Sequence, residues 1–153
     1  MTVAVLRPGS WNLPLFLHVL GATTLFGALI LVLSLTVAAR RSDGHAAVLA
    51  RSAFRTWLAV VVPTFLLMRI AAEWILSREE DQLPKLGDKG WVGVGFGVGD
   101  GGAVFLLALG ITAWLYARRN GTGRAGAVAI VIGSIYLAAL VVAWFAMSAK
   151  PGG

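Results

Sequence analysis

The chain contains no cysteine, and only 13% of its 153 residues are charged. Without cysteine it cannot form disulfides, thiolate metal sites, iron–sulfur clusters or a cysteine nucleophile, and its redox compartment cannot be inferred. A soluble domain carries about 25% charged residues, whereas this chain is 58% hydrophobic and has a mean hydropathy of +0.82. The composition therefore predicts an integral membrane protein.

Acidic residues are also scarce, with 7 Asp and Glu against 13 Lys and Arg, so the formal net charge is +6. An excess of this kind can indicate nucleic-acid binding. Here most basic residues stand at the ends of apolar runs, where they orient a chain in a membrane. We therefore expect a lipid bilayer as the partner and no nucleic acid. The motifs of serine hydrolases and P-loop enzymes are absent as well, which argues against soluble-type catalysis.

Four apolar runs span about residues 13–39, 52–76, 94–117 and 125–148. At about 1.5 Å per residue, each helix can cross a hydrocarbon layer of roughly 30 Å. The first run is too long for the core of a secretory signal and is expected to be retained. The sequence therefore predicts an all-α, polytopic protein in which residues 1–153 form one bundle of four transmembrane helices. Pro63 predicts a kink in the second helix, because it removes the hydrogen bond to Ala59.

The basic residues predict the orientation of this bundle. The first and third connections carry seven arginines and one acid, Asp43, whereas the other side carries five basic residues together with several acids. Loops enriched in Lys and Arg face the cytoplasm, so both termini should be extracytoplasmic in a multi-pass protein of the plasma or inner membrane. The seven arginines are Arg40, Arg41, Arg51, Arg55, Arg118, Arg119 and Arg124.

A glycine-rich segment opens the third run. Its Gly97-x-Gly99-x-x-Gly102 stretch matches the dinucleotide-binding fingerprint only by accident, because no strand precedes it. Spacing by four instead favours a helix-packing face. That face would comprise Gly93, Gly97 and Gly101 on the third helix, opposite Ala125, Ala129 and Gly133 on the fourth. A dimer contact, or an irregular re-entrant start of the third helix, is the alternative use of these glycines.

Four ionisable residues lie within the apolar runs or at their edges: His18, Arg69, Glu73 and Asp100. Helical counting places all four in the outer half of the bundle, and Arg69 and Glu73 share a helix face. Charge inside a membrane is costly, so such residues are normally paired, buried or functional. The cluster is expected either to fix helix packing or to bind a cation or relay a proton.

His18 also raises the question of a cofactor. A buried b-type haem usually has two axial ligands, and His45 lies in a cytoplasmic connection, on the wrong side. Met68, or His18 of a second copy, would have to supply the other ligand. A metal ion held by His18, Glu73 and Asp100 has acceptable ligand types, but no spacing motif supports it. No cofactor is therefore the expectation, with haem or a metal at His18 as the alternative.

The stretch Leu17-His18-Val19-Leu20-Gly21-Ala22 resembles the His-x-x-Gly opening of copper-resistance-D-like and related small integral membrane proteins. The resemblance covers one helix of four and implies a metal- or haem-related role centred on His18. The further histidines expected for copper handling are not found here.

The function expected from these observations is that of a small, non-enzymatic membrane protein, an accessory or interaction subunit of a larger complex or homodimer, with a structural polar cluster. The alternatives are an ion, proton or ligand transporter, and a haem- or metal-binding electron-transfer protein that uses His18. The two halves of the chain show no convincing internal repeat, which argues against a carrier.

The orientation can be tested by cysteine labelling, because the chain has no cysteine of its own. A cysteine at Asp88 should react with a membrane-impermeant reagent in intact cells, and one at Gly121 should be protected. Labelling at position 121 with protection at position 88 would contradict the predicted topology and indicate the opposite one.

Overall fold

The computed structural model describes residues 12–80 and 90–149, and this part of the chain is helical apart from short connections. Charges predicted on the outer side at Arg7, Lys85, Asp88, Lys89 and Lys150 lie outside the described residues. The helices are α1 (Asn12–Arg41), α2 (Ala46–Thr56), the π-helical turn η2 (Trp57–Val61), α3 (Val62–Glu80), α4 (Gly90–Arg118) and α5 (Ala125–Ala149).

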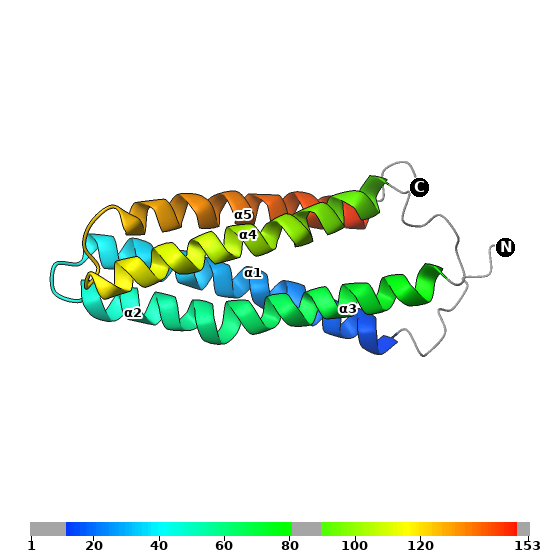
Figure 1. The fold of residues 1–153 in the computed structure, drawn as a ribbon, viewed down its shortest axis with the longest axis horizontal. Helices are drawn as coiled ribbons and strands as arrows, with labels where there is room; N and C mark the ends of the chain where they lie inside the picture. Colours follow the sequence, from blue (N-terminus) through cyan, green and yellow to red (C-terminus); the bar gives the residue numbers. More distant parts are fainter. Residues whose placement is uncertain (1–11, 81–89, 150–153) are drawn as a thin grey trace.

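The segments α2, η2 and α3 follow one another without interruption, so the described chain forms four long rods (Figure 1). Four stretches are long and apolar enough to cross a membrane: Asn12–Arg41, Ala46–Arg78, Gly90–Arg118 and Ala125–Ala149. The prediction of an all-α protein with four potential membrane spans is thereby confirmed. The orientation of the termini stays a prediction.

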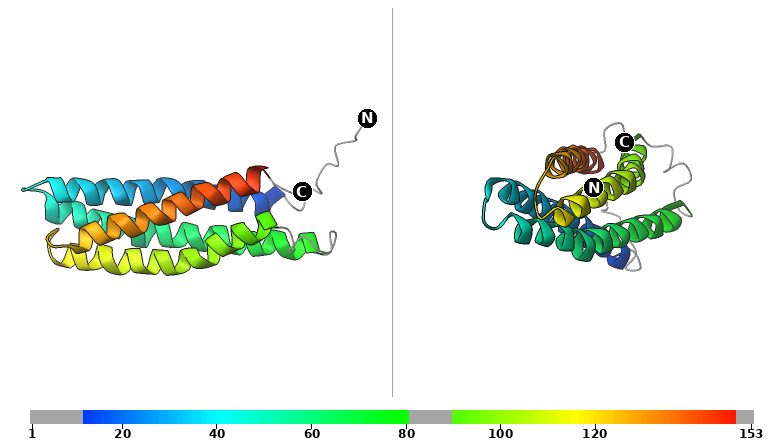
Figure 2. Two further views of the ribbon diagram at one scale, coloured as in Figure 1. Left: turned by 90° about the horizontal axis from the view of Figure 1, so that it is seen from above. Right: turned by 60° about the vertical axis from the view of Figure 1, so that its left-hand side comes forward.

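The rods are arranged as two pairs that separate toward one end. Helix α1 packs on α2 and α3, α4 packs on α5, and further contacts join α1 to α5 and α2 to α4. Past η2, α3 diverges from α4, as the views in Figures 1 and 2 show. We call the end where α1 begins and α5 ends the open end.

The core is built from apolar side chains in the middle of the bundle. Leu25, Leu29 and Val32 of α1 are fully buried and pack in one cluster with Leu109 and Tyr136. Many large apolar side chains are instead exposed, among them Ile70, Val104 and Phe145. Because each helix is apolar on its outward face as well, the bundle suits a lipid environment.

Pro63 produces a local change of helix type. It has no N–H to donate to Ala59, and the turn before it is π-helical, with the N–H of Val62 donating to the carbonyl of Trp57. The hydroxyl of Thr64 donates to the carbonyl of Val60 at 2.7 Å. The discontinuity predicted at Pro63 thus takes the form of a π-helical turn within a continuous helix.

The π-helical turn directs Trp57 toward α4. Its Nε1 donates to the carbonyl of Leu106 at 3.1 Å, and its ring occupies the space beside Gly110 that a Cβ would fill. This contact holds the rod formed by α2, η2 and α3 against α4 in the half of the bundle that is away from the open end. It also explains why Gly110, which is buried, has no side chain.

The predicted packing of Gly93, Gly97 and Gly101 on the fourth helix is wrong, whereas their use in a dimer contact stays a prediction. All three lie on the exposed side of α4, and a Cβ added at any of them would meet no atom within 4 Å. Helix α4 is also regular from Gly90 onward, so the irregular start is not formed. The rotation of α4 about its axis is set by bulky partner side chains, which place other glycines inward.

Besides Gly110, the inward glycines of α4 are Gly95, Gly99 and Gly102. A Cβ at Gly95 would lie 3.0 Å from Sδ of Met147, and one at Gly102 would overlap the phenol of Tyr136. Close packing of α4 on α5 therefore takes place, but large side chains of α5 fill the space beside Gly95 and Gly102. On α5, Ala129 is fully buried and Gly133 faces Leu33 of α1.

The connection between α4 and α5 contains a glycine with a positive φ. Gly121 has φ +81°, and a Cβ there would lie 2.7 Å from the backbone of Ala46. A cysteine at this position would be strained. Thr122, which is exposed in the same connection, is therefore the better labelling site for the topology experiment.

Adjacent glycines provide a matched test of the α4–α5 contact. Gly102→Ala should lower the thermal unfolding temperature in detergent, because its methyl group collides with Tyr136, and overpacking costs about 1–3 kcal/mol. Gly101→Ala should leave that temperature unchanged or raise it, because its methyl group enters open space and alanine favours the helix. Equal effects would contradict this packing arrangement.

Candidate functional site

A cavity of about 390 Å³ lies toward the open end and is lined by residues of α1, α3, α4 and α5. Its wall is mostly apolar and includes several aromatic rings. Two of its side chains, His18 of α1 and Arg69 of α3, are ionisable. The cavity lies where α3 has diverged from α4, and the long side chain of Arg69 crosses the gap between them.

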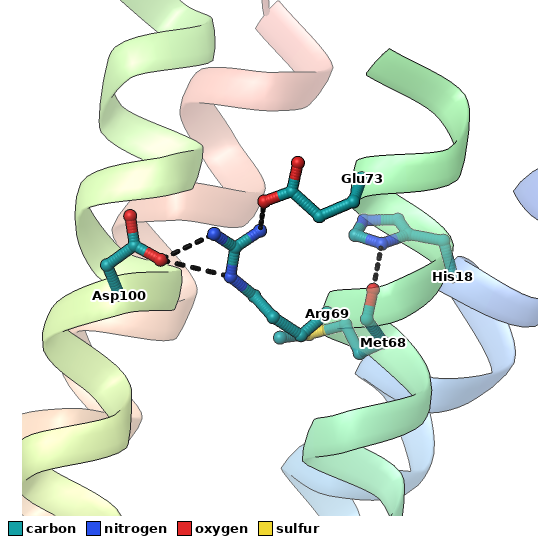
Figure 3. A network of polar contacts seen from close by, with 5 residues as sticks. All are labelled: His18, Met68, Arg69, Glu73 and Asp100. Atoms are coloured by element: carbon teal, nitrogen blue, oxygen red, sulfur yellow. Dashed lines mark hydrogen bonds and ion pairs between the residues drawn. The ribbon is translucent and has the colours of Figure 1, made fainter. Parts of the chain in front are cut away.

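Arg69 spans the gap between α3 and α4 (Figure 3). Its Nε and Nη2 donate to Oδ1 of Asp100 at 3.1 and 2.5 Å, and its Nη1 lies 2.7 Å from Oε1 of Glu73. The guanidinium carbon also stands 4.8 Å above the centre of the Phe96 ring. One cation thus joins two carboxylates from two helices.

The side chain of Arg69 lies along α4 beside Gly99. A Cβ at Gly99 would lie 3.6 Å from Cδ and Nε of Arg69, which is an ordinary van der Waals distance, so the contact does not require glycine. The Arg69 side chain is 21% exposed, whereas the carboxylates of Glu73 and Asp100 are 56% and 64% exposed. The three groups together carry one negative charge when both acids are ionised.

His18 does not join this network, although the sequence grouped it with the other three residues. Its Nδ1 lies 3.1 Å from the backbone carbonyl of Met68 on α3, as Figure 3 shows. A carbonyl oxygen can only accept, so Nδ1 carries the proton in this contact. The structure therefore brings Arg69, Glu73 and Asp100 together and places His18 beside them, on the wall of the same cavity.

Gly21 places His18 within reach of Met68. A Cβ at Gly21 would lie 2.8 Å from the backbone nitrogen of Met68, so only glycine allows α1 to approach α3 so closely. His18 precedes Gly21 by one helical turn and lies on the same side of α1. Gly21 thus sets the distance between α1 and α3, and His18 forms its hydrogen bond across that distance.

The cavity wall also includes aromatic residues that the sequence analysis did not assign to the site. The rings of Phe26 on α1 and Trp144 on α5 meet edge to face, with their centres 6.0 Å apart. Met147 lines the wall next to Gly95. The glycines at alternate positions from 93 to 101 were the sequence signal for this part of the wall. They lie on two faces of the helix, however, and their spacing does not show which face turns inward.

A metal site made of side chains alone is not formed in the part of the chain that the structure describes. Within residues 12–80 and 90–149, no three His, Asp or Glu side chains lie close enough to hold an ion. The alternative in which His18, Glu73 and Asp100 share a metal therefore has no geometric support.

Comparison of the chain with known protein-family models, with curated proteins and with solved structures gives no match in any of the three. The likeness of the first helix to copper-resistance-D-like proteins therefore stays a resemblance of one segment. The four apolar helices agree with a small integral membrane protein, and arguments about function rest on the cavity.

The Arg69 network can be tested by double-mutant cycles on unfolding in detergent. The Arg69–Asp100 pair, which joins two helices, should show a coupling free energy of at least about 0.5 kcal/mol. The Arg69–Glu73 pair, on one helix turn, should give less, about 0.3 kcal/mol. Leucine at each position and in each pair completes the cycles. Zero coupling at Arg69–Asp100 would contradict the bridge.

Proposed function

We propose that this small multi-pass membrane protein binds a lipophilic ligand inside its bundle, at the cavity near the open end. The observation that carries the proposal is the cavity itself, a space of about 390 Å³ that all four rods line. Ligand sites in proteins are typically of about 300–1,000 Å³, largely apolar, with few polar groups that set the orientation. The cavity has each of these properties.

The packing of the rest of the bundle supports a ligand site at this place. Protein interiors are close-packed, so a space of this size between helices differs from the packing of the rest of the bundle. Elsewhere the same helices pack tightly, with Tyr136 against Gly102 and Trp57 against Gly110. A role limited to holding helices together does not need the cavity, whereas a ligand would use its walls.

The polar groups at the cavity define what the ligand needs. The paired guanidinium of Arg69 is one polar feature of the wall, and the imidazole of His18 is the other ionisable group. A ligand with a large apolar body and a group that interacts with histidine matches this wall. The role of an accessory or interaction subunit, expected from the sequence, stays a prediction and does not conflict with ligand binding.

Native mass spectrometry of the full chain, released from a mild detergent, tests the proposal. The wild type should carry a bound small molecule of constant mass. Ala143→Phe should lose it, because residue 143 lines the cavity. Ala138→Phe is the matched control, because this residue lies on the exposed side of the same helix. A bare wild type, or equal adducts on all three proteins, would contradict ligand binding.

A further inference from the structure

Seven arginines lie at the end of the bundle opposite the open end, and we call this the arginine end. They come from the last turn of α1, from α2, from the end of α4 and from the connection before α5: Arg40, Arg41, Arg51, Arg55, Arg118, Arg119 and Arg124. All seven are exposed. Asp43 is the one acidic residue within residues 40–56 and 116–125.

The α1–α2 and α4–α5 connections meet at this end, as Figures 1 and 2 show. A Cβ at Gly121 would lie 2.7 Å from the backbone of Ala46, so the two connections are in direct contact. The Nη2 group of Arg51 donates to Oδ1 of Asn120 at 2.7 Å. A small apolar cluster is buried beneath them, made of Ala39, Ala50, Tyr116 and Ala117. The arginines of both connections therefore form one surface.

The positive charge of this surface is not balanced by the protein. Within residues 12–80 and 90–149, the ion pairs are those of Arg69, and none of the seven arginines lies at ion-pair distance from an acid. Arg51 has a neutral amide as its acceptor, and the guanidinium of Arg118 stands 4.7 Å above the centre of the Trp114 ring. Because arginine stays protonated in proteins, the seven groups repel one another and attract anions.

We infer that the arginine end binds anionic phospholipids of the leaflet that it contacts, with Arg51 and its neighbours holding the phosphate. This surface is separate from the cavity, which lies toward the open end. The spans Asn12–Arg41 and Gly90–Arg118 end on arginine, and the span Ala125–Ala149 begins directly after Arg124. In a bilayer, the ends of the spans lie at the level of the headgroups. The arginines are therefore at the depth of the lipid phosphates.

The choice of arginine over lysine supports this inference. The three lysines of the chain, Lys85, Lys89 and Lys150, all lie elsewhere in the sequence. Lysine and arginine orient a membrane chain alike, so orientation does not require arginine at every position. A phosphate does distinguish them, because arginine binds it through two parallel hydrogen bonds and lysine only as a point charge.

Arg51 is held in place before any lipid is bound. Its acceptor Asn120 has φ +53°, a left-handed conformation that asparagine adopts more readily than most residues. The N–H of Asn120 donates to the carbonyl of Ala117 at 3.1 Å, which fixes this turn on α4. The Nε and Nη1 groups of Arg51 have no hydrogen-bond partner among the described residues. A fixed arginine with free donors loses less side-chain freedom when it binds an anion.

Native mass spectrometry of the full chain in dodecyl maltoside tests the inference. Phosphatidylglycerol and phosphatidylcholine with identical acyl chains are added in equal amounts. The wild type should bind phosphatidylglycerol at least about tenfold more tightly, and this preference should decrease as the salt concentration rises. Inorganic phosphate at the concentration of the lipid should not displace it, because it has no acyl chains to contact the apolar helices.

Substitutions locate the site. Arg51→Gln should lower the preference for phosphatidylglycerol about fivefold, and Arg51→Lys should lower it less, because it keeps the charge but not the planar fork. Arg78→Gln is the matched control, because it removes the same charge from the far end of α3, and it should have no effect. Asn120→Gly keeps every charge and tolerates the positive φ, so its lower preference would report the lost positioning of Arg51. Circular dichroism verifies that each variant is folded.

The outcomes distinguish this surface from the cavity and from other anions. Ala143→Phe, which fills the cavity, should keep the lipid preference. Loss of the preference in that variant would place the lipid in the cavity and overturn a separate site. Equal losses in Arg51→Gln and Arg78→Gln would show an effect of net charge alone and overturn the location. Displacement by inorganic phosphate would assign the site to a soluble anion. A wild type that binds both lipids equally would overturn the inference and leave an acidic protein segment as the partner of these arginines.

Discussion

The close approach of α1 to α3 at Gly21 determines most of what is distinctive in this bundle. The backbone of Met68 lies against the Cα of Gly21, and this contact pulls α3 onto α1 and away from α4. On the other side of Pro63, Trp57 holds the same rod against α4 through Leu106. One continuous helical rod therefore lies against α4 at one end and leaves it at the other, and the cavity is the consequence.

The charged residues follow from the same geometry. Where α3 leaves α4, no small side chain can close the gap, and the long side chain of Arg69 crosses it to reach Asp100. An arginine suits this position because its planar fork can bind two carboxylates at once and stack on an aromatic ring, here Phe96. The ion pair at the edge and the imidazole on the wall are thus two results of one helix divergence.

His18 and the network of Arg69, Glu73 and Asp100 have separate partners, and this separation determines the surroundings of the imidazole. His18 bonds to a neutral backbone carbonyl, whereas Arg69 pairs with two carboxylates and leaves that network with one net negative charge. The ring of His18 is thus set in the mostly apolar part of the wall, where a hydrogen bond is stronger than in water. A cluster in which all four groups met, as the sequence suggested, would instead engage His18 in ion pairs.

The sequence by itself determined the class, the number of long helices and the residues that carry charge within them. These depend on composition and run length, because backbone groups in lipid must be satisfied within each helix. Only the tertiary structure decided which face of α4 turns inward, because the glycines at alternate positions from 93 to 101 occur on two faces of the helix. The inward face is the one whose glycines leave room for bulky partners such as Tyr136. It also decided that His18 bonds to Met68 and not to Glu73 or Asp100, since helical counting gives depth along the bundle but not rotation about each axis.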